Sequence, residues 1–589
     1  MLVHGDAPRR EDPVLSLSAL NGMLRALAAQ PPGLERHAAL ATAFIAAGEL
    51  AQGLADTEFA DLGQDAPSPQ RDAAMALVMR LATALRVSWD SGFLRLPPLG
   101  ECPPLPGVLP GSIAPKRAEG FAFYALYPEA YLQAAAATPL GAGTRVIGLR
   151  SIGLPLAALV ATRLGAQPPL TLRPVGHPFR RGLALSPAMA EALSRSAPAY
   201  AIVDEGPGLS GSSLGAVADH LEDHGVVPDR MHLFPSHQGS PGAQASPRHL
   251  ARWPHLPRHV VDFDTLVLRG TNPVHRLANW VADLTGPPQA PLLDISGGAW
   301  RRLRYGAGEA WPPANPWQER RKFLLTAGGR RWLLKFTGLG KEGSRKAALA
   351  RELSETGLTP PLAGLRYGFL VESWQEAARG LDQAAHDPAA LAAWVARYLG
   401  FRCRRFPTEA GSGASVDMLW EMACHNTAEG LGEDHARALR RHPPDLRLAR
   451  RIRRCATDGR MQPWEWLSLP GQGLWKTDAL DHHAGHDLIG CQDIAWDVVG
   501  AAVELGLAPE ALATGLEAET GQAIDPALLG FYMPCYLAFQ LGAHAMAAAS
   551  NAHLPDEAAR LQTAAARYAA MLRNVIATRD GSMWRVALP

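Results

Sequence analysis

The architecture of the first half of this chain follows from one stretch, AIVDEGPGLSGSS, which runs from Ala201 to Ser213. An apolar strand ends in two adjacent carboxylates, Asp204 and Glu205, and a turn rich in glycine and serine precedes a helical pattern. Such a turn presents backbone N–H groups and the positive end of a helix to an anion. The two carboxylates repel a phosphate and suit a ribose diol or a magnesium ion. The stretch therefore predicts a ligand with a sugar diol at one end and a phosphate at the other.

A second strand and turn lie upstream, in the stretch RVIGLRSIGLPLA from Arg145 to Ala157. Between the two stretches, residues 172–181 are basic and rich in glycine and proline. Predicted strands alternate with helical patterns and begin near Val146, Leu170, Ala201, His232 and Val260. This alternation predicts an α/β fold with a doubly wound parallel sheet.

This order of elements resembles the type I phosphoribosyltransferases, which use phosphoribosyl diphosphate (PRPP). The resemblance implies that Asp204 and Glu205 are catalytic and hold the ribose hydroxyls, and that residues 172–181 form the mobile loop that closes over the diphosphate. It also implies PRPP-binding roles for Arg150, Ser151, Gly153, Gly208, Ser210, Gly211, Ser212 and Ser213. The serine turn departs from the family pattern, because it is one residue longer and Ser212 stands where glycine is common.

Composition sets limits on the partners of this chain. The 589 residues include 57 basic and 56 acidic side chains, a net charge of +1 that favours neither nucleic acid nor membranes. The six cysteines are scattered without a CxxC pair, and no secretory signal is evident, so we expect a cytoplasmic protein. Small molecules are the expected partners, and a homodimer remains open.

The pattern also predicts how the chain is divided. Apolar residues recur at helical spacing over residues 14–28, 36–55 and 71–88, which predicts an N-terminal helical region over residues 1–105. The phosphoribosyltransferase-like domain is expected over residues 106–288. Proline-rich breaks flank it, and a third domain is expected over residues 289–589.

The third domain begins with a predicted β-hairpin. Residues 322–326 and 331–336 flank a Gly-Gly pair, and Lys335 lies on the second strand. A helix over residues 344–356 carries Glu352, and a further strand ends at Glu372. This α+β order resembles the upper lobe of the protein-kinase-like fold, with aminoglycoside and choline kinases as the nearest relatives. The resemblance implies a two-lobe domain in which Lys335, Glu352 and Glu372 bind ATP, with Glu352 orienting Lys335.

The lower lobe carries the rest of the resemblance, in the stretches GLWKTDALDHH from residue 473 and CQDIAWDVVG from residue 491. The resemblance implies that Asp478 is catalytic and accepts the proton of the substrate hydroxyl. It implies that Asp487 and His483 bind Mg²⁺, and that Asp497 braces the catalytic loop. Lys476-Thr477-Asp478 stands where the family has His-Gly-Asp, which puts catalytic competence in question.

These features predict a bifunctional cytoplasmic enzyme that transfers a phosphoribosyl group from PRPP and phosphorylates a small molecule with ATP, using Mg²⁺. One alternative is a PRPP-sensing regulatory protein with a kinase-like or pseudokinase domain. A scaffold built from two degenerate domains is another. The aspartates and histidines between Asp478 and Asp487 also permit a metal-dependent hydrolase.

Overall fold

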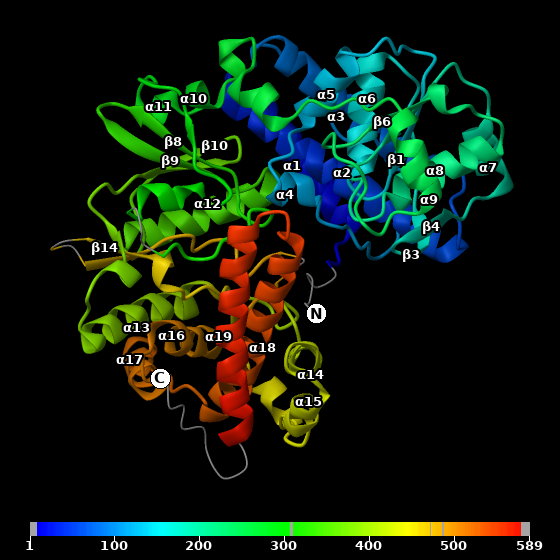
Figure 1. Cartoon of the computed structure of the whole chain (residues 1–589). Coiled ribbons are helices and arrows are strands. Elements are labelled where there is room, and N and C mark those ends of the chain that lie inside the picture. The colour runs from blue at the N-terminus through cyan, green and yellow to red at the C-terminus, as the bar shows by residue number, and fades with distance from the viewer. Residues whose placement is uncertain (1–8, 307–309, 470, 472, 486–487, 579–589) are drawn as a thin grey trace.

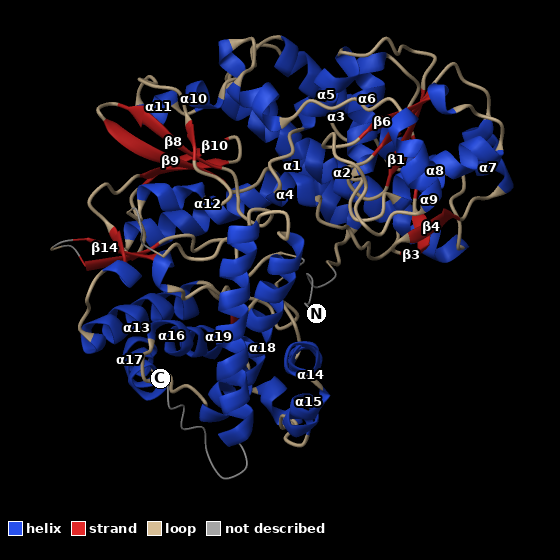
Figure 2. Ribbon diagram, in the orientation of Figure 1, coloured by secondary structure: helices blue, strands red, loops and turns tan. Residues whose placement is uncertain are grey.

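The computed structural model describes residues 9–306, 310–469, 471, 473–485 and 488–578. Figure 1 shows three neighbouring parts: N-terminal helices with a parallel sheet, an antiparallel sheet beside them, and a helical part below. Figure 2 shows that the strands are confined to a few small sheets among many helices.

Three helices form the N-terminal region, as the sequence predicts: α1 (Pro13–Ala29), α2 (Leu34–Leu62) and α3 (Pro69–Asp90). Asp12 and Ser68 cap α1 and α3 by accepting hydrogen bonds from backbone N–H groups of the first turn. By length and composition α2 could cross a membrane, but 72% of its most apolar window is buried inside the structure. It packs as a central helix of this part.

The parallel sheet has four strands in the order β2-β1-β5-β6. They are β1 (Arg145–Leu149), β2 (Leu170–Leu172), β5 (Tyr200–Val203) and β6 (Met231–Phe234). Val146 and Val203 pack on one face with α6 (Gly153–Leu164). Ile147 and Ile202 pack on the other with α8 (Ser212–Asp223). Because side chains alternate along a strand, both faces of this sheet are buried.

One expectation in this part is corrected, and the structure adds detail to another. The segment after Val260 is not a strand: pairing with β6 is limited to an isolated bridge at Arg258, and the side chain of Asp262 then accepts a hydrogen bond from Thr265 N (2.7 Å), which starts a helical turn. The basic segment expected as a mobile loop contains an antiparallel hairpin of β3 (Pro174–His177) and β4 (Arg180–Leu183).

The antiparallel sheet has five strands in the order β10-β11-β9-β8-β7. The predicted hairpin is confirmed as β8 (Lys322–Ala327) and β9 (Arg330–Phe336). It turns at Gly328 and Gly329, whose φ angles of +60° and +74° favour glycine. The remaining strands are β7 (Leu293–Asp294), β10 (Leu362–Arg366) and β11 (Phe369–Ser373), and α12 (Gly340–Glu355) packs beside the sheet.

The lower part is mainly helical. Its helices are α13 (Pro388–Arg405), α14 (Val416–Leu431), α15 (Glu433–Arg440), α16 (Ala495–Leu505), α17 (Pro509–Thr520), α18 (Pro526–Ser550) and α19 (Pro555–Thr578). Its short strands are β12 (Arg379–Gly380), β13 (Arg454–Cys455), β14 (Trp466–Leu469), β15 (Gly473–Lys476) and β16 (Gln492–Asp493). The shorter helices of the upper part are α4 (Glu119–Phe123), α5 (Pro128–Ala136), α7 (Pro187–Ser194), α9 (Pro247–Arg252), α10 (Leu277–Trp280) and α11 (Ala282–Thr285).

One hydrophobic core joins the N-terminal helices, one face of the parallel sheet and the antiparallel sheet. It includes Leu40 of α2, Val203 of β5, Leu334 of β9 and Val371 of β11. The core therefore continues across residue 288, where the sequence predicts a boundary between domains.

A buried polar network reinforces this shared core. Glu129 of α5 accepts hydrogen bonds from the Tyr367 hydroxyl (2.8 Å) and from His37 Nε2 (2.9 Å). His37 Nδ1 also lies 2.9 Å from Ser88 Oγ, and the Tyr127 hydroxyl donates to the carbonyl of Tyr367 (2.7 Å). Because buried polar groups are costly to leave unpaired, this network ties the N-terminal helices and α5 to the turn between β10 and β11.

We expect Glu129→Ala to destabilise the full-length protein by about 2 to 4 kcal/mol, since His37 and Tyr367 lose a buried partner. Tyr367→Phe removes only one of the hydrogen bonds and should cost about 1 kcal/mol. Urea denaturation measures both. Glu191→Ala, at an exposed position of α7, is the matched control and should leave the midpoint unchanged. A Glu129→Ala midpoint equal to that of the control would contradict the structural role of this network.

Candidate functional site

Two adjoining pockets lie between the antiparallel sheet and the helical part. The first, here called the sheet pocket, has an empty volume of about 1100 Å³ and is lined by Lys322, Leu333, Lys335, Glu372, Trp374 and Leu467, among others. The second, the helix pocket, has an empty volume of about 1460 Å³ and is lined by Phe123, Arg320, Arg460, Gln462, Gln540 and His544, among others. Both are lined by Trp300, Glu319, Trp464, Glu465 and Asp478, a set that we call the junction.

Asp478 stands at the centre of a cluster of buried charges. It forms an ion pair with Lys335 and lies 3.6 Å from Lys322 Nζ. Burial alone would raise the pKa of Asp478, but Lys335 and Lys322 hold it well below its usual range. Asp478 also has a left-handed backbone with φ of +52°. Such conformations are uncommon outside glycine and concentrate at functional sites.

Asp481, three residues after Asp478, belongs to the same cluster. Its carboxylate lies 3.0 Å from Lys335 Nζ and forms an ion pair with Lys346 of α12. Burial disfavours the charge on Lys335, but Asp478 and Asp481 outweigh burial and raise the pKa of Lys335. The cluster therefore joins β9, α12 and the segment after β15 through opposite charges.

Glu465, another carboxylate of the junction, differs from Asp478 in its pKa. Its backbone carbonyl accepts hydrogen bonds from Thr477 N (2.8 Å) and Thr477 Oγ1 (3.0 Å), which holds it beside Asp478. Burial raises the pKa of Glu465 to about 7, although Lys476 opposes the shift. A carboxyl group with this pKa can exchange a proton near neutral pH.

The structure brings together some of the predicted ATP-site residues and separates one. Lys335 and Glu372 line the sheet pocket together. Glu352 does not reach Lys335, and forms an ion pair with Arg405 at the surface instead. The phase of α12 explains this correction: the buried face of the helix carries Lys346, Ala350 and neighbours at helical spacing, and Glu352 lies off that face.

Of the two predicted metal ligands, only His483 lies among the described residues. His483 is buried, and its Nε2 accepts a hydrogen bond from Arg345 Nη1 (3.0 Å). Burial and Arg345 lower the pKa of His483 well below its usual range. Asp487 lies outside the described residues. In the part of the chain that the structure describes, no three His, Cys, Asp or Glu side chains are placed to hold a metal ion, which leaves the hydrolase alternative without support there.

Sequence reasoning missed the loop that Asp497 braces. Asp497 accepts hydrogen bonds from Asp458 N (2.7 Å) and Gly459 N (2.8 Å), so it holds the turn before β14 rather than the segment at Asp478. Asp458 is fully buried, 3.4 Å from Lys476 Nζ. The Asp-Gly pair at residues 458 and 459, typical of a turn, was the available signal. Lys346 was also missed, because nothing local in the helix indicates its partner.

The second predicted site lies at the edge of the parallel sheet. Asp204 and Glu205 follow β5, at the end where β1 also stops, and β1 and β5 are neighbours whose next strands lie on opposite sides. Burial raises the pKa of Asp204 to about 6. Burial and then the charge of Asp204 raise the pKa of Glu205 to about 8. The charges of Arg173 and Arg181 oppose the shift at Asp204 but do not outweigh burial.

The serine turn is folded tightly onto the neighbouring hairpin. Gly208 and Gly211 have φ angles of +59° and +61°, and α8 begins at Ser212. The Ser210 hydroxyl donates to Ser212 Oγ (2.9 Å), and the Ser212 hydroxyl donates to the carbonyl of Pro178 (2.7 Å). Ser213 lies in the first turn of α8.

The turn after β1 departs from the expected PRPP contacts. The side chain of Arg150 is fully buried and pairs with Asp56 (2.7 Å) and Asp65 (2.7 Å) from the N-terminal helical region. It therefore faces those residues instead of standing free at the sheet edge. Close packing explains the glycine at position 153, since a Cβ there would come within 2.7 Å of the carbonyl oxygen of Val203. Ser151 lies between them in a half-buried position.

Helix α4 touches both candidate sites. Gly120 N donates to Glu205 Oε2 (3.2 Å), and Leu339 N, at the start of α12, donates to the carbonyl of Phe121 (2.9 Å). Phe123, at the other end of the helix, lines the helix pocket. One short helix thus lies between the carboxylates of the parallel sheet and the second pocket.

Comparison with known proteins gives no match to a family model and none to a curated protein. Among solved structures, the choline kinase LicA of Streptococcus pneumoniae is similar over 42% of this chain and 89% of its own, with 14% identity and a TM-score of 0.29. A choline/ethanolamine kinase family protein of Mesorhizobium loti covers 44% and 88%, with 17% identity and a TM-score of 0.28. Spectinomycin phosphotransferase APH(9)-Ia, solved with ADP and spectinomycin, covers 51% and 95%, with 9% identity and a TM-score of 0.33. With TM-scores of 0.28 to 0.33 and identities of 9% to 17%, the likeness to these small-molecule kinases is too weak to carry a function over to this chain.

The raised pKa of Glu205 predicts a pH-dependent stability. A carboxyl group whose pKa is higher in the folded state stabilises the fold below its ordinary pKa of 4.5, and that contribution is lost as pH rises through about 8. Between about pH 5 and about pH 9, we expect the wild type to lose about 2 kcal/mol more of its free energy of unfolding than Glu205→Gln, because the glutamine cannot ionise. Urea midpoints across that range measure it, with the exposed Glu191→Gln as control. Parallel curves for both variants and the wild type would contradict the shift.

Proposed function

We propose that this chain is an ATP-dependent phosphotransferase that acts on a hydroxyl group of a small molecule. The observation that carries the proposal is the junction at Asp478, where a pocket rich in lysine meets a second pocket of similar size. Phosphoryl transfer needs two substrates held on either side of one charged centre, with cations near the transferred group.

The sheet pocket suits a nucleoside triphosphate. Lys335 and Lys322 extend from neighbouring strands and supply positive charge for phosphate oxygens. Leu333, Leu467 and Trp374 provide an apolar wall for a base. In this proposal the lysines exchange part of their contact with Asp478 for the phosphates when the nucleotide binds.

Magnesium fits the same centre. An ion bound with a nucleotide requires only one or two carboxylates beside phosphate oxygens and water. Asp478 meets this requirement, because it faces both pockets and its low pKa keeps it ionised. When bound, magnesium would neutralise the charge that develops on the phosphates. The same low pKa makes Asp478 a poor acceptor for the hydroxyl proton, so we assign it a charge-holding role.

We expect Lys335→Met to weaken the binding of magnesium-ATP about 100-fold, because a buried charge that would contact the phosphates is removed. Isothermal titration calorimetry on the full-length protein measures the effect. Lys341→Met, at an exposed position of α12, is the matched control and should bind as the wild type does. Equal affinity in the two variants would exclude the sheet pocket as the nucleotide site.

We propose a second function for the parallel sheet, the binding of PRPP. It is supported by the position of Asp204 and Glu205 at the edge where β1 and β5 end side by side with their chain connections leaving in opposite directions, since open α/β sheets bind ligands at such switch points. The start of α8 lies after the same turn and suits the 5′-phosphate. Transfer of the phosphoribosyl group and PRPP sensing without turnover both use this site, and release of pyrophosphate separates them.

We expect the double substitution Asp204→Asn with Glu205→Gln to weaken PRPP binding at least about tenfold in the presence of magnesium, because the ribose diol loses its carboxylate partners. Binding of ATP should be unchanged. The double variant Glu191→Gln with Asp229→Asn neutralises two exposed carboxylates of the same part as a control. Undiminished PRPP affinity in the first variant would remove this site from consideration.

A further inference from the structure

The helix pocket has a positive charge balance beyond the junction. Among the residues that the structure describes, its charged lining side chains there are Arg320, Arg460 and Asp481. Asp481 is already paired with Lys335 and Lys346. A ligand in this pocket therefore meets two guanidinium groups and no free carboxylate on that side.

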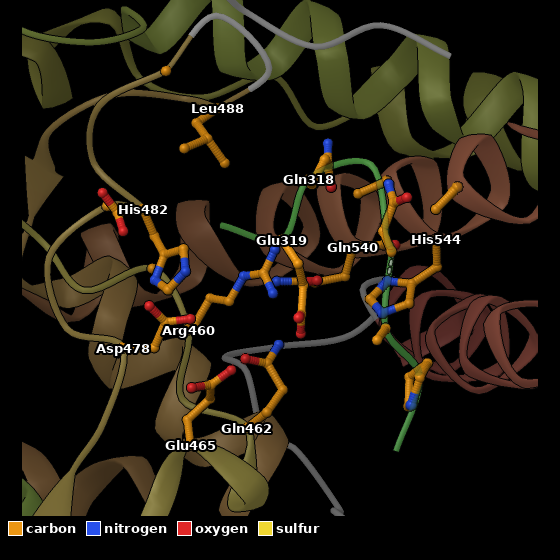
Figure 3. Close-up of a pocket in the computed structure, with 18 of the residues that line it drawn as sticks. Gln318, Glu319, Arg460, Gln462, Glu465, Asp478, His482, Leu488, Gln540 and His544 are labelled. Atoms are coloured by element: carbon orange, nitrogen blue, oxygen red, sulfur yellow. Dashed lines mark hydrogen bonds between the residues drawn. The ribbon is translucent and has the colours of Figure 1, made fainter. Parts of the chain in front are cut away.

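The backbone turn before Arg460 holds this residue at the pocket. It follows the turn of Asp458 and Gly459, which Asp497 fixes through two backbone hydrogen bonds. Figure 3 shows its side chain extending into the pocket. Its charge acts on Glu465 across the same pocket and opposes the rise in the pKa of that carboxyl group, but no described carboxylate forms a direct ion pair with it. A half-buried guanidinium without a direct ion-pair partner can bind a carboxylate or phosphate.

Arg320 faces the same space from the segment before β8. One of its N–H groups donates to the carbonyl of Phe123 (3.0 Å), and its guanidinium lies 4.9 Å from the centre of the Phe123 ring. These contacts orient the group without neutralising it. A guanidinium carries five N–H donors, so most of them remain for a ligand.

Glu319, the junction carboxylate next to Arg320 in the sequence, already has hydrogen-bond partners in the protein. Glu319 accepts hydrogen bonds from Gly298 N and from Trp300 Nε1, both at 2.8 Å. Such bonds stabilise its negative charge within the protein and leave little of it for a cationic ligand. The junction side of the helix pocket still presents Asp478 and Glu465, so an anion would bind on the arginine side, away from these carboxylates.

The remaining polar groups suit hydroxyls. Gln462 has a buried amide oxygen with no hydrogen-bond partner, and Gln540 is also buried beside the pocket. His544 Nδ1 lies 2.8 Å from the carbonyl of Gln540, and burial lowers the pKa of His544 to about 4, so the ring is neutral. Phe123 and Phe539 add flat apolar faces. Neutral amides and aromatic faces together are typical of sites for sugars and related polyols.

We propose that the phosphoryl acceptor is a hydroxylated small molecule that carries a phosphate or carboxylate group, with the anion on Arg460 and Arg320 and the hydroxyl directed to the junction. The proposal rests on the phosphotransferase function above. The acceptor oxygen forms a bond to the γ-phosphorus of ATP while the bond from that phosphorus to the bridging oxygen breaks. ADP leaves, and the hydroxyl proton passes to solvent.

Calorimetry on the full-length protein, saturated with magnesium and a non-hydrolysable ATP analogue, tests the proposal. Ribose 5-phosphate and D-glycerate probe the two anionic groups, ribose and glycerol are neutral probes, and choline and ethanolamine are cationic. We expect at least one anion to bind at least about tenfold more tightly than its neutral partner and than either cation. Which anion binds distinguishes phosphate from carboxylate. Failure of the analogue itself to bind would count against the proposed function, and tighter binding of a cation or equal binding of all probes would overturn only the acceptor class.

Substitutions locate the bound anion. We expect Arg460→Gln to weaken binding of the preferred anion at least about tenfold and Arg460→Lys to retain most of it, with affinity for the ATP analogue unchanged in both. Retained nucleotide binding shows that the variants are folded. Arg447→Gln, at an exposed arginine, is the matched control. Anion affinity that is the same in Arg460→Gln, Arg320→Gln and the control would place the anion elsewhere and overturn the proposal.

Discussion

The pairing of Lys335 with Asp478 and Asp481 is the constraint on which the lower site depends. Lys335 and Asp481 are buried and Asp478 is half-buried, and buried ions are tolerated only when they are paired and well oriented. The pairing therefore holds β9 of the antiparallel sheet against the segment after β15, and Lys346 adds α12 to the same cluster. Two pockets meet at this point because the charges that join the elements also face the space between them.

The upper site has the opposite electrostatic design. Asp204 and Glu205 are adjacent in the sequence, and their pKa values are raised to about 6 and about 8. Ionising two buried, neighbouring carboxyl groups is unfavourable, and a cation or a hydroxyl-rich ligand bound beside them would lower that free energy. Helix α4 contacts Glu205 at one end and lines the helix pocket at the other, and a single hydrophobic core surrounds it. The two sites are therefore parts of one packed structure, although the sequence divides the chain between them.

Local patterns predicted the elements well. The Gly-Gly pair between two apolar runs predicted the hairpin of β8 and β9, and helical spacing predicted α1, α2 and α3. Contacts between distant residues were beyond such patterns. From the sequence, Arg150 was expected to be a free cation after a strand. In the structure it pairs with Asp56, which lies 94 positions earlier. Glu352 lies on the predicted helix, yet the rotation of that helix turns it toward Arg405 and brings Lys346 to the cluster.

The sequence by itself determined the strands, the helices and the residue types at each sheet edge, because backbone geometry and hydrophobic periodicity act over a few neighbouring positions. It also placed Asp204 and Glu205 at the end of a strand. Only the tertiary structure decided which carboxylates of the two sites are neutralised and which are left unpaired. That outcome depends on lysines and arginines far away in the chain, and on burial, which governs the strength of every charge interaction at the two sites.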